Sequence, residues 1–174
     1  MDRRTVLAVS GIAAVSGLAG CLGSTGQPDN SPNQTDEGSS QPADESGIVT
    51  QSVDDESVEA AVQRITESIE TNEGLSLVAE LDHAANAATV DMELPPMVVL
   101  FFGNPAAGTP LMQESLTAGL DLPQRMLVWD DEGTVQVSYN DPEFVASRHG
   151  IEGQDERLGN VRTALDTIAT GDSG

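Results

Sequence analysis

Met97-Val98-Val99-Leu100-Phe101-Phe102-Gly103-Asn104-Pro105 is the stretch of sequence that decides the fold. Its first six residues are all apolar, and they lie between Pro95-Pro96 and a Gly-Asn-Pro sequence that interrupts regular structure. An apolar run of this length and with these borders predicts a strand, residues 97–102, that is covered on both faces. Such a strand needs partners, and the flanking sequence predicts them.

Upstream, we expect a strand over residues 48–53 followed by a helix. Ser52 or Asp54 would cap this helix, and Asp54, Asp55 and Glu56 would occupy its first turn, where acidic side chains are favourable. Gly74 suits its exit. The buried face is predicted from apolar residues at helical spacing, namely Val58, Ala61, Val62, Ile65 and Ile69.

Between this helix and the apolar run, residues 75–82 alternate between apolar and polar side chains, which predicts a strand buried on one side. The alanine-rich residues 83–89 predict a short helix.

Downstream, the glycines and prolines of residues 103–110 predict an irregular backbone. Strands over residues 125–129 and 135–139 would form a hairpin through Asp131-Glu132-Gly133. Asp141-Pro142 opens a short helix that ends near Gly150. A closing helix over residues 155–169 would turn one apolar face inward, made of Leu158, Val161, Leu165 and Ile168.

The order of these elements predicts an α/β (α+β) fold. We expect a single compact domain over residues 48–170, with an about five-stranded mixed sheet packed with helices, ending in a β-hairpin and C-terminal helices. A segment of this length suffices for one hydrophobic core.

The chain is strongly acidic: 29 Asp and Glu stand against 7 Arg and no Lys, for a formal charge of −22. This composition resembles that of proteins from halophilic archaea, and we expect folding to depend on salt, because salt screens the repulsion between carboxylates. A nucleic-acid partner is excluded, since binding to phosphates needs a basic surface.

The N-terminus predicts export and lipid attachment. Arg3-Arg4 resembles a twin-arginine signal, an uncharged apolar stretch follows, and Leu18-Ala19-Gly20-Cys21 has the form of a lipoprotein cleavage site. Residues 1–20 would be the signal peptide, and lipid on Cys21 would hold the protein at the outer face of the cell membrane. An uncleaved transmembrane anchor is the alternative. With Cys21 modified, no thiol remains for disulfides or metal binding.

Residues 21–47 are rich in Gly, Ser, Pro, Gln, Asn and acidic residues, which predicts a disordered acidic linker. Asn33-Gln34-Thr35 within it is a glycosylation sequon.

Candidate binding residues cluster after the apolar run, where strand ends often carry sites. These candidates are Asn104, Thr109, Asp121, Tyr139 and Asp141. Each also has a structural interpretation, because the first three can stabilise turns and the last two can hold a neighbouring loop. His83 and His149 can act as general bases, although a surface or capping role is the more ordinary one. No metal site or cofactor is predicted, because calcium-loop, phosphate-loop and dinucleotide motifs are absent.

Several motifs resemble the domain of unknown function 302 family, over about residues 49–168. They are Phe102-Gly103-Asn104-Pro105, Gly108-Thr109-Pro110-Leu111-Met112, Leu120-Asp121-Leu122-Pro123, Val128-Trp129-Asp130, Val137-Ser138-Tyr139-Asn140-Asp141-Pro142, Arg148-His149-Gly150 and Asp82-His83-Ala84-Ala85. The resemblance implies a compact α/β domain and dimerisation, with no established activity. Some relatives have Cys at the position of Gly103, so a thiol role there does not transfer.

Taken together, the sequence favours a non-catalytic, membrane-tethered domain that binds a small ligand or a protein partner. The site would combine residues 103–112 with the Tyr139–Asp141 corner. An enzyme using histidine and carboxylates, of a hydrolase or isomerase type, and a structural homodimer of the cell envelope are the alternatives.

Overall fold

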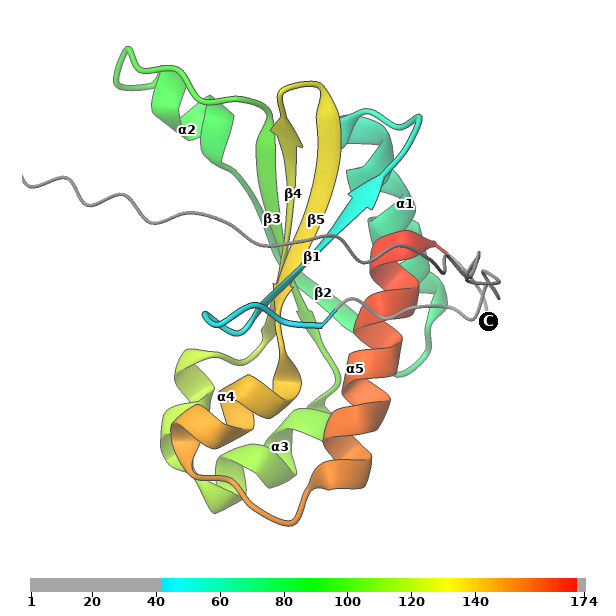
Figure 1. The fold of residues 1–174 in the computed structure, drawn as a ribbon, viewed down its shortest axis with the longest axis vertical. Helices are drawn as coiled ribbons and strands as arrows, with labels where there is room; N and C mark the ends of the chain where they lie inside the picture. Colours follow the sequence, from blue (N-terminus) through cyan, green and yellow to red (C-terminus); the bar gives the residue numbers. More distant parts are fainter. Residues whose placement is uncertain (1–41, 172–174) are drawn as a thin grey trace, which may run out of the picture. The chain divides into compact units, whose positions relative to one another are not determined.

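The computed structural model describes residues 42–171, which form five strands, five α-helices and one short 3-10 helix (Figure 1). The predictions for the signal peptide, for Arg3, Arg4 and Cys21, and for the sequon at Asn33 lie outside these residues. Part of the predicted linker is described. There, Ala43 packs against the core, and the backbone N–H of Asp141 donates to the carbonyl of Gly47 at 2.8 Å.

The five strands form one sheet in the order β1-β5-β4-β3-β2. Their bounds are β1 Ile48–Val53, β2 Ser76–Asp82, β3 Met97–Gly103, β4 Gln124–Asp131 and β5 Thr134–Asn140. Every neighbouring pair is antiparallel, so the predicted α+β class is confirmed but the sheet is not mixed. The early β-α-β unit does place β1 and β2 parallel; however, the other three strands lie between them.

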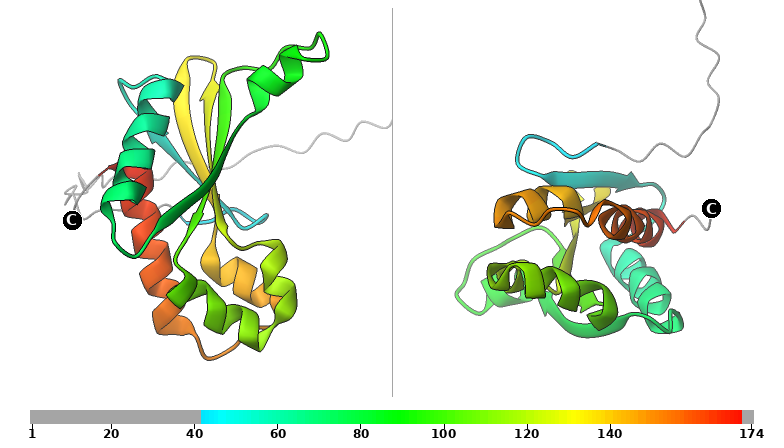
Figure 2. Two further views of the ribbon diagram at one scale, coloured as in Figure 1. Left: turned by 180° about the vertical axis from the view of Figure 1, so that it is seen from behind. Right: turned by 90° about the horizontal axis from the view of Figure 1, so that it is seen from below.

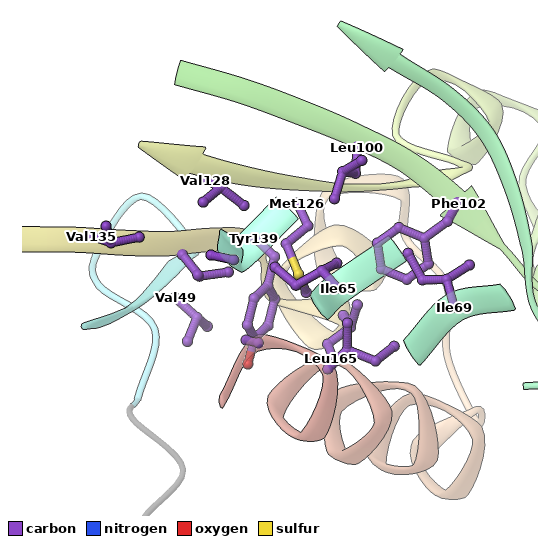
Figure 3. Packing of buried hydrophobic residues seen from close by; sticks show 14 of the residues in the cluster. Val49, Ile65, Ile69, Leu100, Phe102, Met126, Val128, Val135, Tyr139 and Leu165 are labelled. Carbon is purple, nitrogen blue, oxygen red and sulfur yellow. The ribbon is translucent and has the colours of Figure 1, made fainter. Parts of the chain in front are cut away.

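Two helices, α1 Val58–Thr71 and α5 Asp155–Thr170, pack on one face of this sheet (Figures 1 and 2). Figure 3 shows the core between the layers. Leu100, Phe102 and Met126 of the sheet contact the buried side chains of α1 and α5, among them Ile65 and Leu165. On the opposite face of β3, Val99 is buried and Phe101 is half-buried. The strand prediction for residues 97–102 is therefore confirmed, and the face opposite α1 and α5 is only partly covered.

The start of α1 differs from the prediction. Its N-cap is Ser57, whose hydroxyl accepts from the backbone N–H of Ala60 at 3.2 Å. Asp54 and Asp55 instead lie in a turn, because β1 continues to Val53 through its pairing with β5. The inward face of α1 is as predicted.

β2 is an edge strand and is largely exposed, so the predicted burial of one side holds only near its start, where Leu75 and Leu77 pack partly buried against the core. A register shift between Leu77 and Ala79 breaks the alternation, and Ala79 and Leu81, which were predicted to be buried, are exposed. The reason is the bulge, which leaves two residues opposite one and turns the strand.

The prediction of an irregular backbone over residues 103–110 is wrong: Gly103 ends β3, and residues 105–110 are helical and begin α3, Pro105–Glu114. Asn104 caps this helix by accepting from the backbone N–H of Ala106 at 2.8 Å, and Pro105 suits its first position. A 3-10 helix, η1 Leu116–Leu120, follows. The Gly-Asn-Pro sequence therefore starts a helix instead of preventing one.

The remaining predictions of helices and strands are confirmed. The β4–β5 hairpin turns at Glu132 and Gly133, both with positive φ. α2 is His83–Ala88, and α4 is Pro142–His149, which ends at Gly150 in the left-handed conformation that glycine tolerates. None of the helices within residues 42–171 has the length and hydrophobicity that crossing a membrane requires.

Candidate functional site

A cavity of about 900 Å³ lies among the end of β3, the start of β2, and helices α3 and α5. Figures 1 and 2 show α3 and the first half of α5 close together at this end of the sheet. The polar side chains that line the cavity are Asn72, Ser76, Asn104, Thr109, Gln124, Gln154, Glu156, Arg157 and Asn160. Most of the other lining residues are apolar, so the cavity suits a molecule that is itself largely apolar.

One wall of the cavity is α3, which contains an internal proline. Pro110 has no N–H, so the carbonyl of Ala106 lacks the helical hydrogen bond that residue 110 would otherwise donate. The Nη1 of Arg157 donates to that carbonyl at 3.2 Å. The Nε of the same guanidinium donates to Oε1 of Gln154 at 3.1 Å. Arg157 therefore joins α5 to α3 at the edge of the cavity.

The opposite wall is one face of α5, and its polarity changes along the helix. Arg157 and Gln154 lie near the N-terminal end, whereas Ala164, Leu165 and Ile168 line the cavity further along. Arg157 and Ile168 are eleven residues apart, which corresponds to about 16 Å along a helix axis. The cavity is thus polar at one end and apolar at the other.

Arg157 is unlike the other arginines of residues 42–171. Arg64 pairs with Glu56, Arg125 and Arg148 pair with Asp121, and Arg162 pairs with Asp141 and Asp166. Arg157 is the one arginine in this part of the chain without a carboxylate partner. In so acidic a domain, an arginine held only by neutral oxygens at a cavity is a candidate for anion recognition.

A second polar cluster ties α5 to the sheet and to α4. The Tyr139 hydroxyl donates to Asp166, which also accepts from Gln51 at 2.7 Å. Arg162 donates to Asp166 at 3.1 Å and to Asp141, and it lies 5.8 Å from the centre of the Tyr139 ring. Figure 3 shows the Tyr139 hydroxyl directed at α5. Burial, and then the hydrogen bond to Asp166, raises the pKa of Tyr139 well above its usual value of 10.

The carboxylate of Asp141 has a further partner, since it caps α4 by accepting from the backbone N–H of Glu143 at 2.7 Å and of Phe144 at 3.1 Å. The hydrogen bonds of this cluster connect β1, β5, α4 and α5, and none of its residues lines the cavity. Its geometry is that of a structural cluster.

A third cluster surrounds the buried carboxylate of Asp121. His149 Nε2 lies 2.7 Å from its Oδ2, and Arg125 donates to its Oδ1 at 2.9 Å. The other ring nitrogen of His149 is hydrogen-bonded to the hydroxyl of Thr117 at 2.9 Å. This series of hydrogen-bonded groups joins the C-terminal end of α4 to η1 and to the start of β4.

No group of three or more His, Cys, Asp or Glu within residues 42–171 is placed to hold a metal ion.

A family model, described as "Domain of unknown function DUF302", matches residues 49–168. This chain belongs to the DUF302 family. The match confirms the resemblance drawn from the sequence motifs, and the motif residues Asn104 and Thr109 of this DUF302 domain line the cavity.

The curated relatives of this DUF302 domain are longer proteins. The chain is 39% identical over 108 residues to "Fluoride-specific ion channel FluC 1" of Brucella suis, matching 62% of this chain and 42% of that one. A protein of the same name from Brucella abortus and "Fluoride-specific ion channel FluC 2" of Brucella melitensis match at the same identity, over 39% of their length. The chain thus spans about two fifths of the length of the curated relatives it matches.

A solved structure supports the fold. "Crystal structure of uncharacterized conserved protein DUF302 from Bacillus stearothermophilus" superposes with a TM-score of 0.64 at 19% identity, covering 71% of this chain and 95% of that one. At this identity the similarity shows the fold alone.

The structure divides the candidate residues of this DUF302 domain among four places. Asn104 and Thr109 line the cavity; Tyr139 and Asp141 belong to the Arg162 cluster; Asp121 and His149 form the third cluster. His83 begins α2, at the opposite end of the sheet (Figure 1). The structure does not bring residues 103–112 and the Tyr139–Asp141 corner into one concavity.

Arg157 was missed by the sequence reasoning, although the sequence holds a signal. Residues 153, 154, 160 and 161, three and four positions away along α5, include no acid. Arg162, by contrast, has Asp166 four residues on. In an acidic helix, an arginine with no acidic neighbour at these spacings lacks a local ion-pair partner.

Proposed function

We propose that this protein binds a small, largely apolar ligand in the cavity between α3 and α5, and that it does so at the outer face of a cell membrane. The observation that carries the proposal is the cavity of about 900 Å³, with its mainly apolar lining and its few polar groups. Small-molecule sites usually have this size and make-up, with a small number of polar groups that orient the ligand.

The membrane part of the proposal rests on sequence signals and on the relatives. Arg3-Arg4, the apolar stretch and Cys21 follow the pattern of a twin-arginine lipoprotein signal, and the residues between Cys21 and Ala43 would then tether the domain. The Brucella relatives are named as ion channels, and this chain corresponds to about two fifths of their length. A domain of this kind therefore occurs in chains named for a membrane activity.

Fluoride, which those relatives' names mention, is not the ligand that we propose. A bare anion of that size needs N–H or cationic groups on several sides to replace its water. The cavity here is far larger and is lined mainly by apolar groups.

Mass spectrometry of the mature N-terminus tests the anchoring. We expect a lipid-modified Cys21 as the first residue, and a Cys21→Ser variant that is not processed in this way. An intact Met1 in the membrane fraction would contradict cleavage.

The acidic composition supports a high-salt environment, so purification and assays belong in concentrated potassium chloride.

A cavity-filling variant tests the binding. Ala164 lines the cavity, and Ala164→Phe would occupy the space of a ligand. We expect it to weaken binding of Nile red, an uncharged apolar dye, by about tenfold or more. Ala60→Phe is the matched control, because Ala60 is exposed on α1 and lies outside the cavity. Equal dye binding by Ala164→Phe and the wild type would contradict the cavity as the site.

One observation favours the enzyme alternative, namely the hydrogen-bonded chain Thr117–His149–Asp121. A histidine held by a carboxylate and bonded to a hydroxyl is an arrangement suited to general-base catalysis. None of these three residues lines the cavity, however. If the Thr117–His149–Asp121 series is catalytic, we expect His149→Gln to abolish enzymatic turnover and Ala164→Phe to leave it unchanged.

A further inference from the structure

Arg157 has hydrogen-bonding capacity left over at the edge of the cavity. A guanidinium carries five N–H donors and no acceptor. The hydrogen bonds to Gln154 and to the Ala106 carbonyl use two of them, on Nε and Nη1. The remaining N–H donors, including both on Nη2, have no hydrogen-bond partner in residues 42–171.

The two bonds that Arg157 does make fix its position. The Ala106 carbonyl is available only because Pro110 lacks an N–H, and Gln154 is held in turn by donating to Glu114 at 3.0 Å. The guanidinium is therefore oriented by neutral groups while its charge remains uncompensated. A cation that is already positioned loses less entropy when it binds an anion.

The charges around Arg157 limit the kind of anion. Glu156 also lines the cavity, so a ligand with two negative charges would meet repulsion there. No side chain caps the first turn of α5, whose backbone N–H groups favour negative charge nearby. Further along the cavity, the walls formed by Leu165, Ile168 and Phe102 suit an apolar group.

We propose that the cavity takes an amphipathic monoanion, such as a carboxylate with an apolar tail, whose charged group pairs with Arg157 and whose tail lies along α5 toward Ile168. This inference rests on the proposed function and names its ligand class. A planar carboxylate can accept two N–H groups from one guanidinium, which an alcohol of the same length cannot do.

The test compares ligands that share one tail and differ in the charged group. Decanoate, decanol, decyltrimethylammonium and decyl phosphate are each used to displace Nile red from the protein in concentrated potassium chloride. Three proteins are compared: the wild type, Arg157→Gln, and Arg148→Gln as the matched control. Arg148 lies on α4, its side chain is 60% exposed, and it does not line the cavity.

For the wild type we expect decanoate to bind about tenfold or more tightly than decanol, with decyltrimethylammonium weakest. Arg157→Gln is expected to bring decanoate to the affinity of decanol while decanol itself is unchanged, and Arg148→Gln to keep the wild-type ratio.

The proposal is overturned if Arg157→Gln keeps the preference for decanoate, or if decyl phosphate binds more tightly than decanoate. Failure of the underlying function looks different, because then Ala164→Phe would leave the binding of Nile red and of all four compounds unchanged.

Discussion

Helix α5 carries two arginines, five residues apart, whose surroundings are opposite. Arg162 lies between Asp141 and Asp166 and beside the ring of Tyr139, and it connects α5 to α4 and the sheet. Arg157 contacts only the neutral oxygens of Gln154 and Ala106, and it faces a cavity. The comparison teaches that the arginines paired with carboxylates connect elements of this acidic domain, whereas Arg157, which has no carboxylate partner in residues 42–171, is the one that we propose binds a ligand.

The largest effect is expected where charges are paired and mostly buried. Arg162→Met leaves Asp141 and Asp166 without their cation, although these carboxylates are only 11% and 15% exposed. We expect a loss of about 3 kcal/mol in the free energy of unfolding. Urea unfolding, followed by the fluorescence of the single tryptophan, measures it. A loss below about 1 kcal/mol would show that the Arg162 cluster is not structural.

The Asp121 cluster extends the comparison to a second set of paired charges. Asp121→Asn removes the charge that Arg125 and His149 contact in a buried position, and we expect a loss of about 2 kcal/mol. The same urea titration measures it. Arg148→Gln, which removes the exposed partner of Asp121 at 3.4 Å, should cost no more than about 0.5 kcal/mol. Equal losses of unfolding free energy in Asp121→Asn and Arg148→Gln would mean that the burial of the charge does not determine how much stability is lost.

Tyr139 gives a pH-dependent test of the Arg162 cluster. Its pKa is raised in the folded protein by burial and by Asp166, so the folded state retains a proton that the unfolded chain releases above about pH 10. The stabilisation is complete below pH 10 and is lost as the pH rises, by about 1.4 kcal/mol per pH unit. The chain has one tyrosine, so tyrosinate absorbance reports this residue alone, and it has no lysine that would add to the alkaline fall in stability.

Tyr139→Phe is the control for that titration. It should lower the unfolding free energy near neutral pH by about 1.5 kcal/mol, because a hydrogen bond to a carboxylate is lost. It should also flatten the alkaline fall in stability. An unchanged alkaline slope in Tyr139→Phe would assign that slope to another group.

A small effect on stability is also expected at Arg157. Arg157→Met removes two hydrogen bonds to neutral oxygens and leaves no carboxylate unpaired, so we expect a loss of about 1 kcal/mol in the free energy of unfolding. Urea unfolding beside Arg162→Met measures the contrast on one helix. A loss as large as that of Arg162→Met would make Arg157 structural as well and would remove the distinction between the two arginines.

The local elements were largely predictable because their signals are local. The spacing of Val58, Ala61 and Ile65 placed the inner face of α1, and Gly133 and Gly150 marked a turn and a helix end. Two predictions failed for local reasons that an isolated pattern does not resolve. Asn104-Pro105 can either break or begin a helix, and alternation in residues 75–82 does not reveal a bulge.

The candidate site was less predictable than the fold. Asn104 and Thr109 do line the cavity. The other candidate residues bind partners that are distant in sequence and lie outside it, namely Tyr139, Asp141, Asp121 and His149. Tyr139 meets Asp166, and His149 meets Asp121, only after α5 and α4 have packed. Long-range hydrogen bonds of this kind leave no periodic trace in the sequence.

By itself, the sequence determined the acidic charge, the motifs shared with DUF302 domains and most of the helices and strands, because composition, spacing and turn residues act over a few positions. Tertiary structure alone decided that the sheet is antiparallel throughout, that Arg162 also meets Asp141 and Tyr139, and that Arg157 lies at a cavity. The physical reason is that ion pairs and cavities form between elements brought together by packing, so their partners are set by the fold rather than by neighbours along the chain.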